Sequence, residues 1–194
     1  MKKLLVATHN AGKKKEIQDI LSDLSYVVLM LDDIENKIQL PEEMGATYEE
    51  NALIKARFAG ESSQLLTMAD DSGLEVSALP GELGVRTARY APGADADRNI
   101  KLLVAMKDVR DRKARFISCI TLYDPTTKQT QVFIGEMGGT ISEESKGTNG
   151  FGFDPVFIPE GYTQTFAELG ATVKNEISHR AKALRQLKRA LETV

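Results

Sequence analysis

LLTMADDSGLEV, residues 65–76, is the stretch around which the rest of the chain can be interpreted. Its first half is a short apolar run with the length of a buried strand. The run stops at two adjacent carboxylates, Asp70 and Asp71, which are followed by Ser72 and by Gly73, a residue suited to a tight turn. We therefore expect the two acids to lie at the end of a strand.

Two neighbouring carboxylates at the edge of a core admit two interpretations. Burying both is unfavourable unless a proton or a cation neutralises them, so Asp70 and Asp71 are a natural place for a divalent metal. Alternatively, they are solvated turn residues between two strands, because Asp, Ser and Gly are the usual turn formers. The rest of the chain has to decide between the two.

Composition and charge limit the class of protein. The 194 residues, 42% of them hydrophobic, suffice for one domain with a sizeable core. A net charge of -3 and a pI of about 5.5 argue against duplex nucleic acid as the main partner. Cys119 lies in an apolar run, where a buried free thiol is consistent with a reducing compartment. The N-terminal apolar run is too short for a signal peptide, and no stretch approaches the roughly 20 apolar residues of a spanning helix, so we expect a soluble, cytoplasmic protein that does not contact a membrane.

The N-terminal segment has the arrangement of a phosphate-binding site. Residues 3–7 read as a strand, and residues 8–16 form a polar loop that enters a helix carrying Lys13. A helix N-terminus attracts anions through its free N–H groups and the positive end of its dipole. The Walker spacing is absent, and an ordinary helix start with solvated lysines explains the segment equally well. His9 reads as a loop residue, because no second histidine or cysteine lies nearby at metal-ligand spacing.

A second helix is expected after a loop that carries Glu42. Thr47 and Glu50 form a capping box, so this helix should run from about residue 48 to about residue 60. Glu42 is either a favourable partner of the helix dipole or a third metal carboxylate beside the two aspartates.

The remaining elements predict a mixed α/β fold. Strands are expected at residues 26–31, 74–76, 114–123, 130–137 and 156–158, a hairpin turn at 124–128, and helices at 95–107 and 174–191. The two strands that flank the hairpin turn are expected to be antiparallel partners, so helices and strands do not alternate strictly.

A glycine-rich stretch, GTNGFGFDP at residues 147–155, is typical of a ligand-binding loop. Its glycines let the backbone approach a ligand closely, and the rings of Phe151 and Phe153 offer stacking surfaces. Alternatively, the two rings anchor a surface loop in the core.

Lys174, His179 and Arg180 cluster near the start of the last expected helix. Basic groups at that end oppose the helix dipole unless they face a ligand or an acid. The cluster therefore favours binding over a solvated helix face.

Seven motifs, in this order, closely resemble the inosine triphosphate pyrophosphatase family. They are Thr8-x-Asn10-x-x-Lys13-x-x-Glu16, Glu42-x-x-Gly45-x-Thr47, Glu50-Asn51-Ala52, Ala69-Asp70-Asp71-Ser72-Gly73-Leu74, Ala88-Arg89-Tyr90, Gly150-Phe151-Gly152-Phe153-Asp154-Pro155 and Ser178-His179-Arg180. Members of this family hydrolyse non-canonical purine nucleoside triphosphates, such as ITP, dITP and XTP, to the monophosphate and pyrophosphate. His9, Thr87 and Phe153 depart from the residues that are common in the family, which are Gly, Ser, and Tyr or Trp.

The resemblance implies an α/β fold in which an elongated mixed β-sheet is flanked by helices. Residues 1–194 would form a single domain with two lobes and a central active-site cleft. The implied cofactor is Mg²⁺, and the implied assembly is a homodimer. Glu42 and Asp71 become metal ligands, Asp71 is also the general base, and Asp70 and Lys13 are further catalytic residues. The implied substrate-binding residues are Thr8, His9, Asn10, Ala11, Gly12, Lys13, Ser72, Phe151, Gly152, Phe153, Asp154, Lys174, His179 and Arg180.

Two other functions stay open beside pyrophosphate release. One is a nucleotide-binding sensor without turnover, and the other is a broad metal-dependent nucleotide phosphatase. The combination of Glu42, Asp70, Asp71 and Lys13 favours turnover, because a protein that only binds a triphosphate does not need a close pair of acids beside it.

Overall fold

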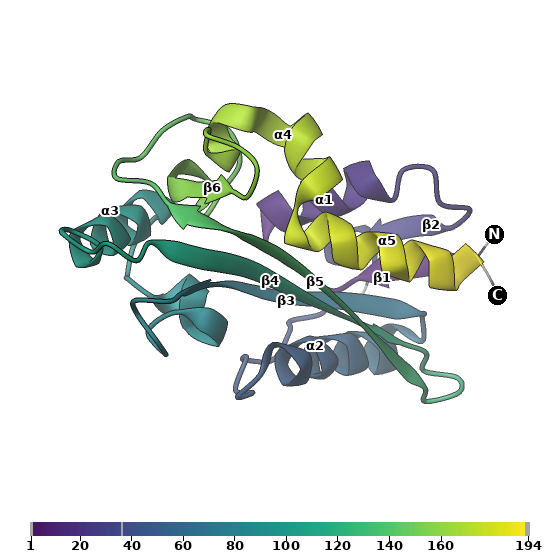
Figure 1. The fold of residues 1–194 in the computed structure, drawn as a ribbon. Coiled ribbons are helices and arrows are strands. Elements are labelled where there is room, and N and C mark those ends of the chain that lie inside the picture. The colour runs from purple at the N-terminus through teal and green to yellow at the C-terminus, as the bar shows by residue number, and fades with distance from the viewer. Residues whose placement is uncertain (1, 36, 193–194) are drawn as a thin grey trace. The chain divides into compact units, whose positions relative to one another are not determined.

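The computed structural model describes residues 2–35 and 37–192, in which strands and helices are mixed along the chain. The strands are β1 (Lys3–Val6), β2 (Val27–Met30), β3 (Thr67–Val76), β4 (Lys113–Tyr123), β5 (Thr130–Ile141) and β6 (Phe157–Pro159). The helices are α1 (Ala11–Ile20), α2 (Tyr48–Ser63), α3 (Asp95–Ala105), α4 (Phe166–Ile177) and α5 (His179–Glu192), with 3-10 turns η1 (Leu31–Asp33), η2 (Gly84–Arg89) and η3 (Asp154–Val156). The six strands form one mixed sheet in the order β2-β1-β3-β4-β5-β6 (Figure 1), which confirms the expected α/β class.

The chain divides into two compact units. Unit 1 comprises Met1–Asp71, Ser118–Gly135 and Arg180–Val194. Unit 2 comprises Ser72–Ile117 and Glu136–His179. Strands β3, β4 and β5 contribute residues to both units.

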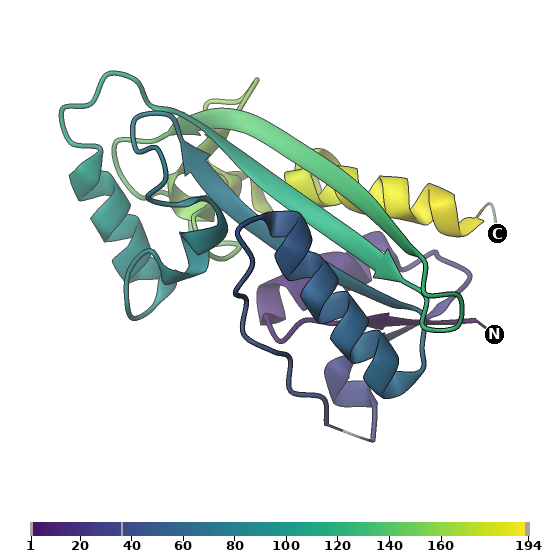
Figure 2. The same cartoon turned by 90° about the horizontal axis from the view of Figure 1, so that it is seen from below.

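In unit 1, helices cover both faces of the parallel strands β2, β1 and β3. Leu4 and Val6 pack into a cluster with α1 and α5, whereas Leu5 and Ala7 pack into a cluster with α2. This alternation follows from the two-residue period of a strand. Figure 2 is viewed from the α2 side of these strands. Cys119 of β4 is a buried free cysteine, as expected, and burial raises the pKa of its thiol to about 12.

In unit 2, aromatic rings fill the core. The ring of Phe116 lies 4.7 Å from that of Phe157, which lies 5.4 Å from that of Phe166. Strands β5 and β6 approach so closely that a Cβ on Gly139 would lie 2.2 Å from the carbonyl oxygen of Ile158. Glycine is therefore required there by the spacing of the two strands.

The expectation that a strand ends at Asp70 and Asp71 is wrong. Strand β3 continues from Thr67 through both acids to Val76, and Gly73 lies within the strand instead of forming a turn. The physical reason is that each carboxylate is buried against cationic or amide donors, so the chain need not turn to expose the acids to water.

The expectation of one C-terminal helix over residues 174–191 is also wrong. Helix α4 ends at Ile177, and α5 begins at His179, because Ser178 has an extended backbone with φ -65° and ψ 161°. Lys174 therefore lies in the last turn of α4, where a cation interacts favourably with the negative end of the helix dipole. Strand β5 also runs further than expected, to Ile141.

The predicted start of α2 is confirmed. Helix α2 begins at Tyr48 behind a capping box in which Thr47 and Glu50 each accept a backbone N–H of the other. Among residues 2–35 and 37–192, no helix combines the length and the apolar character that crossing a bilayer requires.

Candidate functional site

Strand β3 directs its two adjacent acids to opposite faces of unit 1. Met68 packs into the cluster of α1 and α5, and Ala69 packs into the cluster of α2. Side chains alternate along a strand, so the Asp70 side chain points to the same face as Met68. The Asp71 side chain points to the same face as Ala69. The two carboxylates are therefore not a side-by-side pair, as the sequence suggested, but one acid on each face.

Asp70 is the centre of a buried polar network on the α1 and α5 face. Its Oδ2 lies 2.7 Å from Lys13 Nζ and 3.3 Å from Arg180 Nη2. Its Oδ1 accepts a hydrogen bond from the hydroxyl of Ser118. The Asp70 side chain is fully covered, and all of its contacts come from different elements, namely α1, α5 and β4.

This network holds Asp70 in the ionised form. Burial by itself raises the pKa of a carboxyl group, but the charges of Arg180 and Lys13 outweigh it and hold the pKa of Asp70 well below its usual range. Arg180 also forms an ion pair with Glu16 of α1, so its guanidinium lies between two carboxylates. Burial lowers the pKa of Lys13, and the nearby positive charges of Lys55 and Arg180 add to that effect.

Asp71 faces α2 and has weaker partners. Asn51 Nδ2 donates to its Oδ2 at 3.0 Å, and Lys55 Nζ lies 3.8 Å from its Oδ1. Lys55 is held more closely by Glu43, at 2.5 Å. Burial raises the pKa of Asp71, and the negative charge of Glu43 adds to the rise. Asp71 is thus a buried acid without full neutralisation, which fits a role in binding a cation or accepting a proton.

The two lysines meet at the backbone of β3. Lys55 Nζ donates to the carbonyl oxygen of Asp70 at 2.9 Å, and Lys13 Nζ donates to the same oxygen at 3.2 Å. Strand β1 pairs with β3 only as far as Met68, so this carbonyl lies beyond the paired region. Positive charge from both faces is therefore gathered at the carboxyl end of β1, the edge at which parallel sheets bind ligands.

Helix α1 begins at that same edge. Asn10 is its N-cap, and its side chain accepts the N–H of Lys13 at 3.0 Å. Thr8 Oγ1 accepts the N–H of Asn10 at 3.2 Å, which shapes the loop between β1 and α1. In helix geometry the N–H groups of Ala11 and Gly12 have no acceptor within the helix, so they are suited to an anion. His9 is exposed in this loop.

The loop that carries Glu42 is tied to the same site through Asn51. The N–H of Gly45 donates to Asn51 Oδ1 at 2.8 Å, while Asn51 Nδ2 binds Asp71. Glu42 itself is exposed. Within the described ranges 2–35 and 37–192, no three His, Cys, Asp or Glu side chains gather closely enough to hold a metal ion. Two acids of this loop, Glu42 and Glu43, are therefore the candidates to bind a metal ion together with Asp71.

Unit 2 brings together part of the sequence-predicted nucleoside site. Lys174 Nζ lies 2.5 Å from Asp154 Oδ2 and 4.5 Å from the ring centre of Phe151. Asp154 Oδ2 also accepts the N–H of Phe151 at 2.9 Å. A Cβ on Gly150 would lie 2.0 Å from that oxygen, so the loop closes over Asp154 only with glycine there. Phe151 is half-buried.

Two other predicted residues of unit 2 lie in its core. Phe153 is 3% exposed, with its ring 6.4 Å from that of Tyr90, so it anchors the loop as the alternative interpretation held. His179 is 3% exposed, and its ring stacks on Phe116 at 4.6 Å. Ser72 is half-buried within β3.

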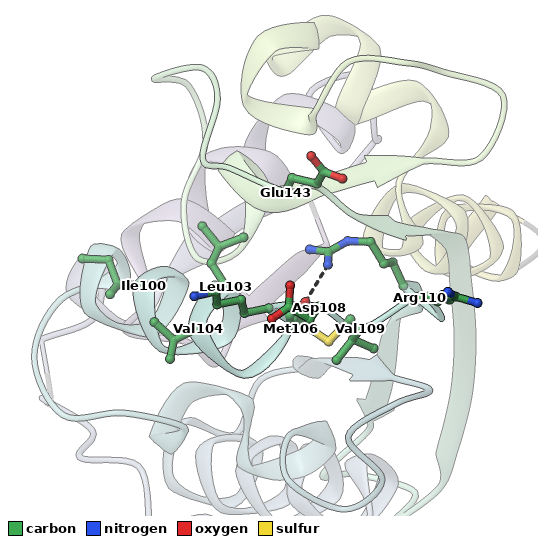
Figure 3. A pocket seen from close by; sticks show the side chains of 10 residues that line it. Ile100, Leu103, Val104, Met106, Asp108, Val109, Arg110 and Glu143 are labelled. Atoms are coloured by element: carbon green, nitrogen blue, oxygen red, sulfur yellow. Dashed lines mark hydrogen bonds between the residues drawn. The ribbon is translucent and has the colours of Figure 1, made fainter.

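A hollow of about 800 Å³ lies elsewhere in unit 2, beside α3 (Figure 3). Its apolar wall includes Leu103, Val104 and Val109. Arg112 lines it too, but the guanidinium donates to the carbonyls of Met106, Ile141 and Ser142 and so is used in the fold. None of the sequence-predicted site residues lines this hollow.

Several residues of the polar networks had no role assigned from the sequence, although Glu16 and Asn51 lie within the quoted motifs. The residues without an assigned role are Glu16, Asn51, Lys55, Ser118, Asp95 and Asn99. Asn51 and Lys55 do carry a local signal, because they lie four residues apart on a helix face otherwise lined by alanines. Asp95 and Asn99 are likewise four residues apart on one helix, whereas Ser118 shows no such signal.

Comparisons with known proteins agree with these features. Residues 4–190 match the model of the Ham1 family. A dITP/XTP pyrophosphatase of Haemophilus influenzae is 47% identical, with 97% of this chain and 98% of the relative covered. A dITP/XTP pyrophosphatase of Oceanobacillus iheyensis is 42% identical over the whole of both chains.

Solved structures show the same fold. A HAM1 protein from Coxiella burnetii has a TM-score of 0.90 at 38% identity, with both chains fully covered. The Staphylococcus aureus Ham1 protein has a TM-score of 0.86 at 37% identity, with 99% of each chain covered. These matches confirm the resemblance to the inosine triphosphate pyrophosphatases: the chain belongs to the Ham1 family.

Proposed function

We propose that this protein hydrolyses dITP, XTP and ITP to the nucleoside monophosphate and pyrophosphate, and so removes non-canonical purine nucleotides from the nucleotide pool. Two full-length relatives named dITP/XTP pyrophosphatase support the substrate class. The observation that carries the proposal is the location of Asp71: it is a buried acid 3.8 Å from Lys55, next to the carbonyl of Asp70 to which Lys55 and Lys13 of α1 both donate.

Asp71 is the proposed general base. A water molecule attacks the α-phosphorus, its proton passes to the Asp71 carboxylate, and pyrophosphate leaves. A carboxylate within hydrogen-bond reach of the attacking water can take its proton as the water attacks. Asn51 would hold the carboxylate in place through its bond to Oδ2.

The loop before α1 is the proposed cradle for the triphosphate. The N–H groups of Ala11 and Gly12 and the side chains around Thr8, His9 and Asn10 would bind phosphate oxygens. Lys13 would stabilise the charge that develops on the departing pyrophosphate. Asp70 and Arg180 act indirectly, because they hold Lys13 from within the buried network.

The residues of this site fit a magnesium ion. Asp71 is an acid that its neighbours do not fully neutralise, and the loop tied to it through Asn51 carries Glu42, an exposed carboxylate. Asp71 and Glu42 would hold the ion, since Mg²⁺ prefers carboxylate oxygens. When bound, it would neutralise phosphate charge and lower the pKa of its water.

The loop over residues 150–154 and Lys174 form the proposed base-binding part of unit 2. The half-buried ring of Phe151 would stack on the purine, and Gly152, Asp154 and Lys174 would supply hydrogen bonds. Phe153 and His179 support this loop and the core from within. Arg180 was expected to bind the substrate, but its two carboxylate partners lead us to propose a positioning role in unit 1 instead.

Product analysis tests the proposed function. The protein is incubated with dITP, XTP, ITP and ATP in the presence of Mg²⁺, and the products are separated by ion-exchange chromatography. We expect monophosphate and pyrophosphate in equal amounts from the first three and little from ATP. Orthophosphate instead of pyrophosphate would indicate a phosphatase, and binding without any product would indicate a sensor.

A homodimer is the proposed assembly. Ile100 and Val104 lie four residues apart on α3 and are 61% and 69% exposed, a pair of apolar side chains that a second copy would cover. Size-exclusion chromatography with light scattering tests it, and a mass near 21.3 kDa would rule it out.

A further inference from the structure

The loop that carries Phe151 is held to helix α3 through Gly152. The N–H of Gly152 donates to Asp95 Oδ2 at 2.6 Å, and its carbonyl accepts from Asn99 Nδ2 at 3.0 Å. Asp95 and Asn99 are four positions apart on α3, so they lie on the same face of the helix. One residue of the loop is thus fixed at both its donor and its acceptor, and we call this pair the Asp95–Asn99 clamp.

The clamp residues are themselves held in place for this contact. Arg98 forms an ion pair with Asp95, and its Nη1 donates to the carbonyl of Gly93 at 3.1 Å. Asn99 is 5% exposed, and its Oδ1 has no hydrogen-bond partner in the part of the chain that the structure describes. A buried amide oxygen without a partner is destabilising, whereas an apolar side chain of similar size is not. The bond from Asn99 Nδ2 to Gly152 gives asparagine a reason to occupy this position.

The neighbours of Gly152 are fixed as well, but Phe151 is left half-buried. Phe153 is anchored in the core, and Asp154 accepts the N–H of Phe151. Gly152 has a φ of 62°, a backbone conformation that glycine adopts without strain. Its ideal Cβ would meet nothing within 4 Å, so the constraint at this position is conformational. The loop backbone therefore fixes where the Phe151 side chain starts, and the centre of its ring lies 4.5 Å from Lys174 Nζ.

We infer that Asp95 and Asn99 are positioning residues for nucleotide recognition: by holding Gly152 at both peptide groups, they keep the Phe151 ring in the orientation that stacks on a purine. The inference rests on the proposed function. A loop that is ordered before the ligand arrives does not lose that freedom on binding, so the clamp raises affinity for the base. The phosphate chemistry of unit 1 does not depend on it.

The test compares a substrate that has a base with one that lacks it. Asn99→Ala, Asp95→Ala and Asp95→Asn are assayed on ITP and on ribose 5-triphosphate. We expect the KM for ITP to rise about fivefold in Asn99→Ala and about tenfold in Asp95→Ala, which loses a charged acceptor. The KM for ITP should rise less in Asp95→Asn, because the amide oxygen of the new side chain can still accept the N–H of Gly152. The kcat for ITP and the kcat/KM for ribose 5-triphosphate should stay within about twofold of wild type in all three, since a base contact adds only to base binding.

Asp97→Asn is the matched control. It removes an acid from the same turn of α3, but its carboxylate accepts the N–H of Ala94 and so caps the helix. We expect its KM for ITP to equal that of the wild type. Thermal unfolding of every variant identifies any loss that is due to misfolding, and Asp95→Asn keeps the test valid if Asp95→Ala does not fold.

Combining the clamp variants with Phe151→Ala gives a second readout. If the clamp acts through Phe151, Asn99→Ala should add little to the loss already caused by Phe151→Ala. Additive losses, equal losses on the two substrates, or an unchanged KM for ITP in Asn99→Ala and Asp95→Ala would each overturn the inference.

Binding of IMP, measured by calorimetry, separates this inference from the proposed function. A wild type that releases no pyrophosphate but binds IMP more tightly than Asn99→Ala contradicts the proposed reaction and supports the clamp. An active wild type whose IMP affinity equals that of Asn99→Ala and Asp95→Ala contradicts the clamp alone. A wild type that does not bind IMP contradicts both.

Discussion

Asp70 and Asp71 are adjacent in the chain but differ in what surrounds them. Asp70 has two cations and a hydroxyl as partners, and their charges hold its pKa well below the usual range. Asp71 has an amide and a more distant lysine, and burial raises its pKa. Removing an acid from a fully neutralised buried network destabilises the fold, whereas an incompletely neutralised acid is suited to chemistry. The same substitution at the two positions should therefore have different results.

Asp71→Asn should remove turnover and leave the fold intact. The amide keeps the shape of the carboxylate but cannot accept the proton of the attacking water, so we expect kcat for ITP to fall by about 10² to 10⁴. The urea unfolding midpoint should stay close to that of the wild type. A folded variant with wild-type kcat would show that Asp71 is not the base.

Asp70→Asn should instead weaken the fold. It leaves Lys13 and Arg180 without their buried counter-charge, and breaking a buried ion pair costs about 3–5 kcal/mol of unfolding free energy. Urea denaturation followed by circular dichroism measures this loss. An unchanged midpoint for Asp70→Asn would mean that the network does not stabilise unit 1.

Glu42→Gln and Glu43→Gln form a matched pair in the loop before α2. Glu43 is held by Lys55, whereas Glu42 is exposed and is the proposed metal ligand. We expect Glu42→Gln to shift the Mg²⁺ concentration for half-maximal activity upward by about tenfold, because it loses one charged ligand. Glu43→Gln should change this concentration much less. A larger shift of this concentration in Glu43→Gln than in Glu42→Gln would show that Glu43 is the metal ligand.

The starts of α1 and α2 have the same local chemistry and different proposed roles. Asn10 caps α1 by accepting the N–H of Lys13, and Thr47 caps α2 by accepting the N–H of Glu50. The Thr47 cap was predicted from its capping box, whereas Asn10 was predicted only as part of a polar loop that enters a helix. The α1 cap also lies at the carboxyl end of β1, where the triphosphate is proposed to bind.

Asn10→Ala and Thr47→Ala should separate capping from binding. Each substitution removes one cap and should lower the free energy of unfolding by about 1 kcal/mol. Only Asn10→Ala should also raise the KM for ITP, because it disturbs the cradle for the phosphates. Steady-state kinetics of both proteins, with their urea midpoints, provides the comparison. If Asn10→Ala and Thr47→Ala had the same KM for ITP, the phosphates would bind away from the start of α1.

Secondary structure was predictable where short-range patterns decide it. The capping box placed the start of α2 at Tyr48, and short apolar runs located β1 and β4. The break at Ser178 was not predictable, because neither a proline nor a glycine marks it and its extended backbone depends on the surrounding fold. The length of β3 was not predictable either, since two acids in sequence look like the end of a strand.

The complete chain is acidic, with a net charge of -3, and its proposed substrate is a polyanion. Local cations such as Lys13 and Lys55 reduce the repulsion but are already engaged with carboxylates. A divalent ion would supply the missing positive charge for the triphosphate.

Removal of divalent ions should therefore abolish both turnover and ligand stabilisation. With excess EDTA we expect no pyrophosphate from ITP, and full recovery once Mg²⁺ is added in excess. A non-hydrolysable α,β-methylene analogue of ITP should raise the melting temperature with Mg²⁺ present and much less without it, because a ligand stabilises only the state that it binds. Undiminished hydrolysis in EDTA would contradict a metal requirement.

The chain's local patterns were enough to establish its class, most helix starts and its membership of a family, because capping, turn chemistry and side-chain alternation depend on residues a few positions apart. The partners of the buried charges were decided by folding. Arg180 reaches Asp70 across 110 positions, and Lys13 reaches it across 57. No short-range pattern reports such contacts, and they determine which of two identical neighbouring acids is neutralised. Asp70 and Asp71 therefore acquire different partners only when folding places them on opposite faces of β3, each against different helices.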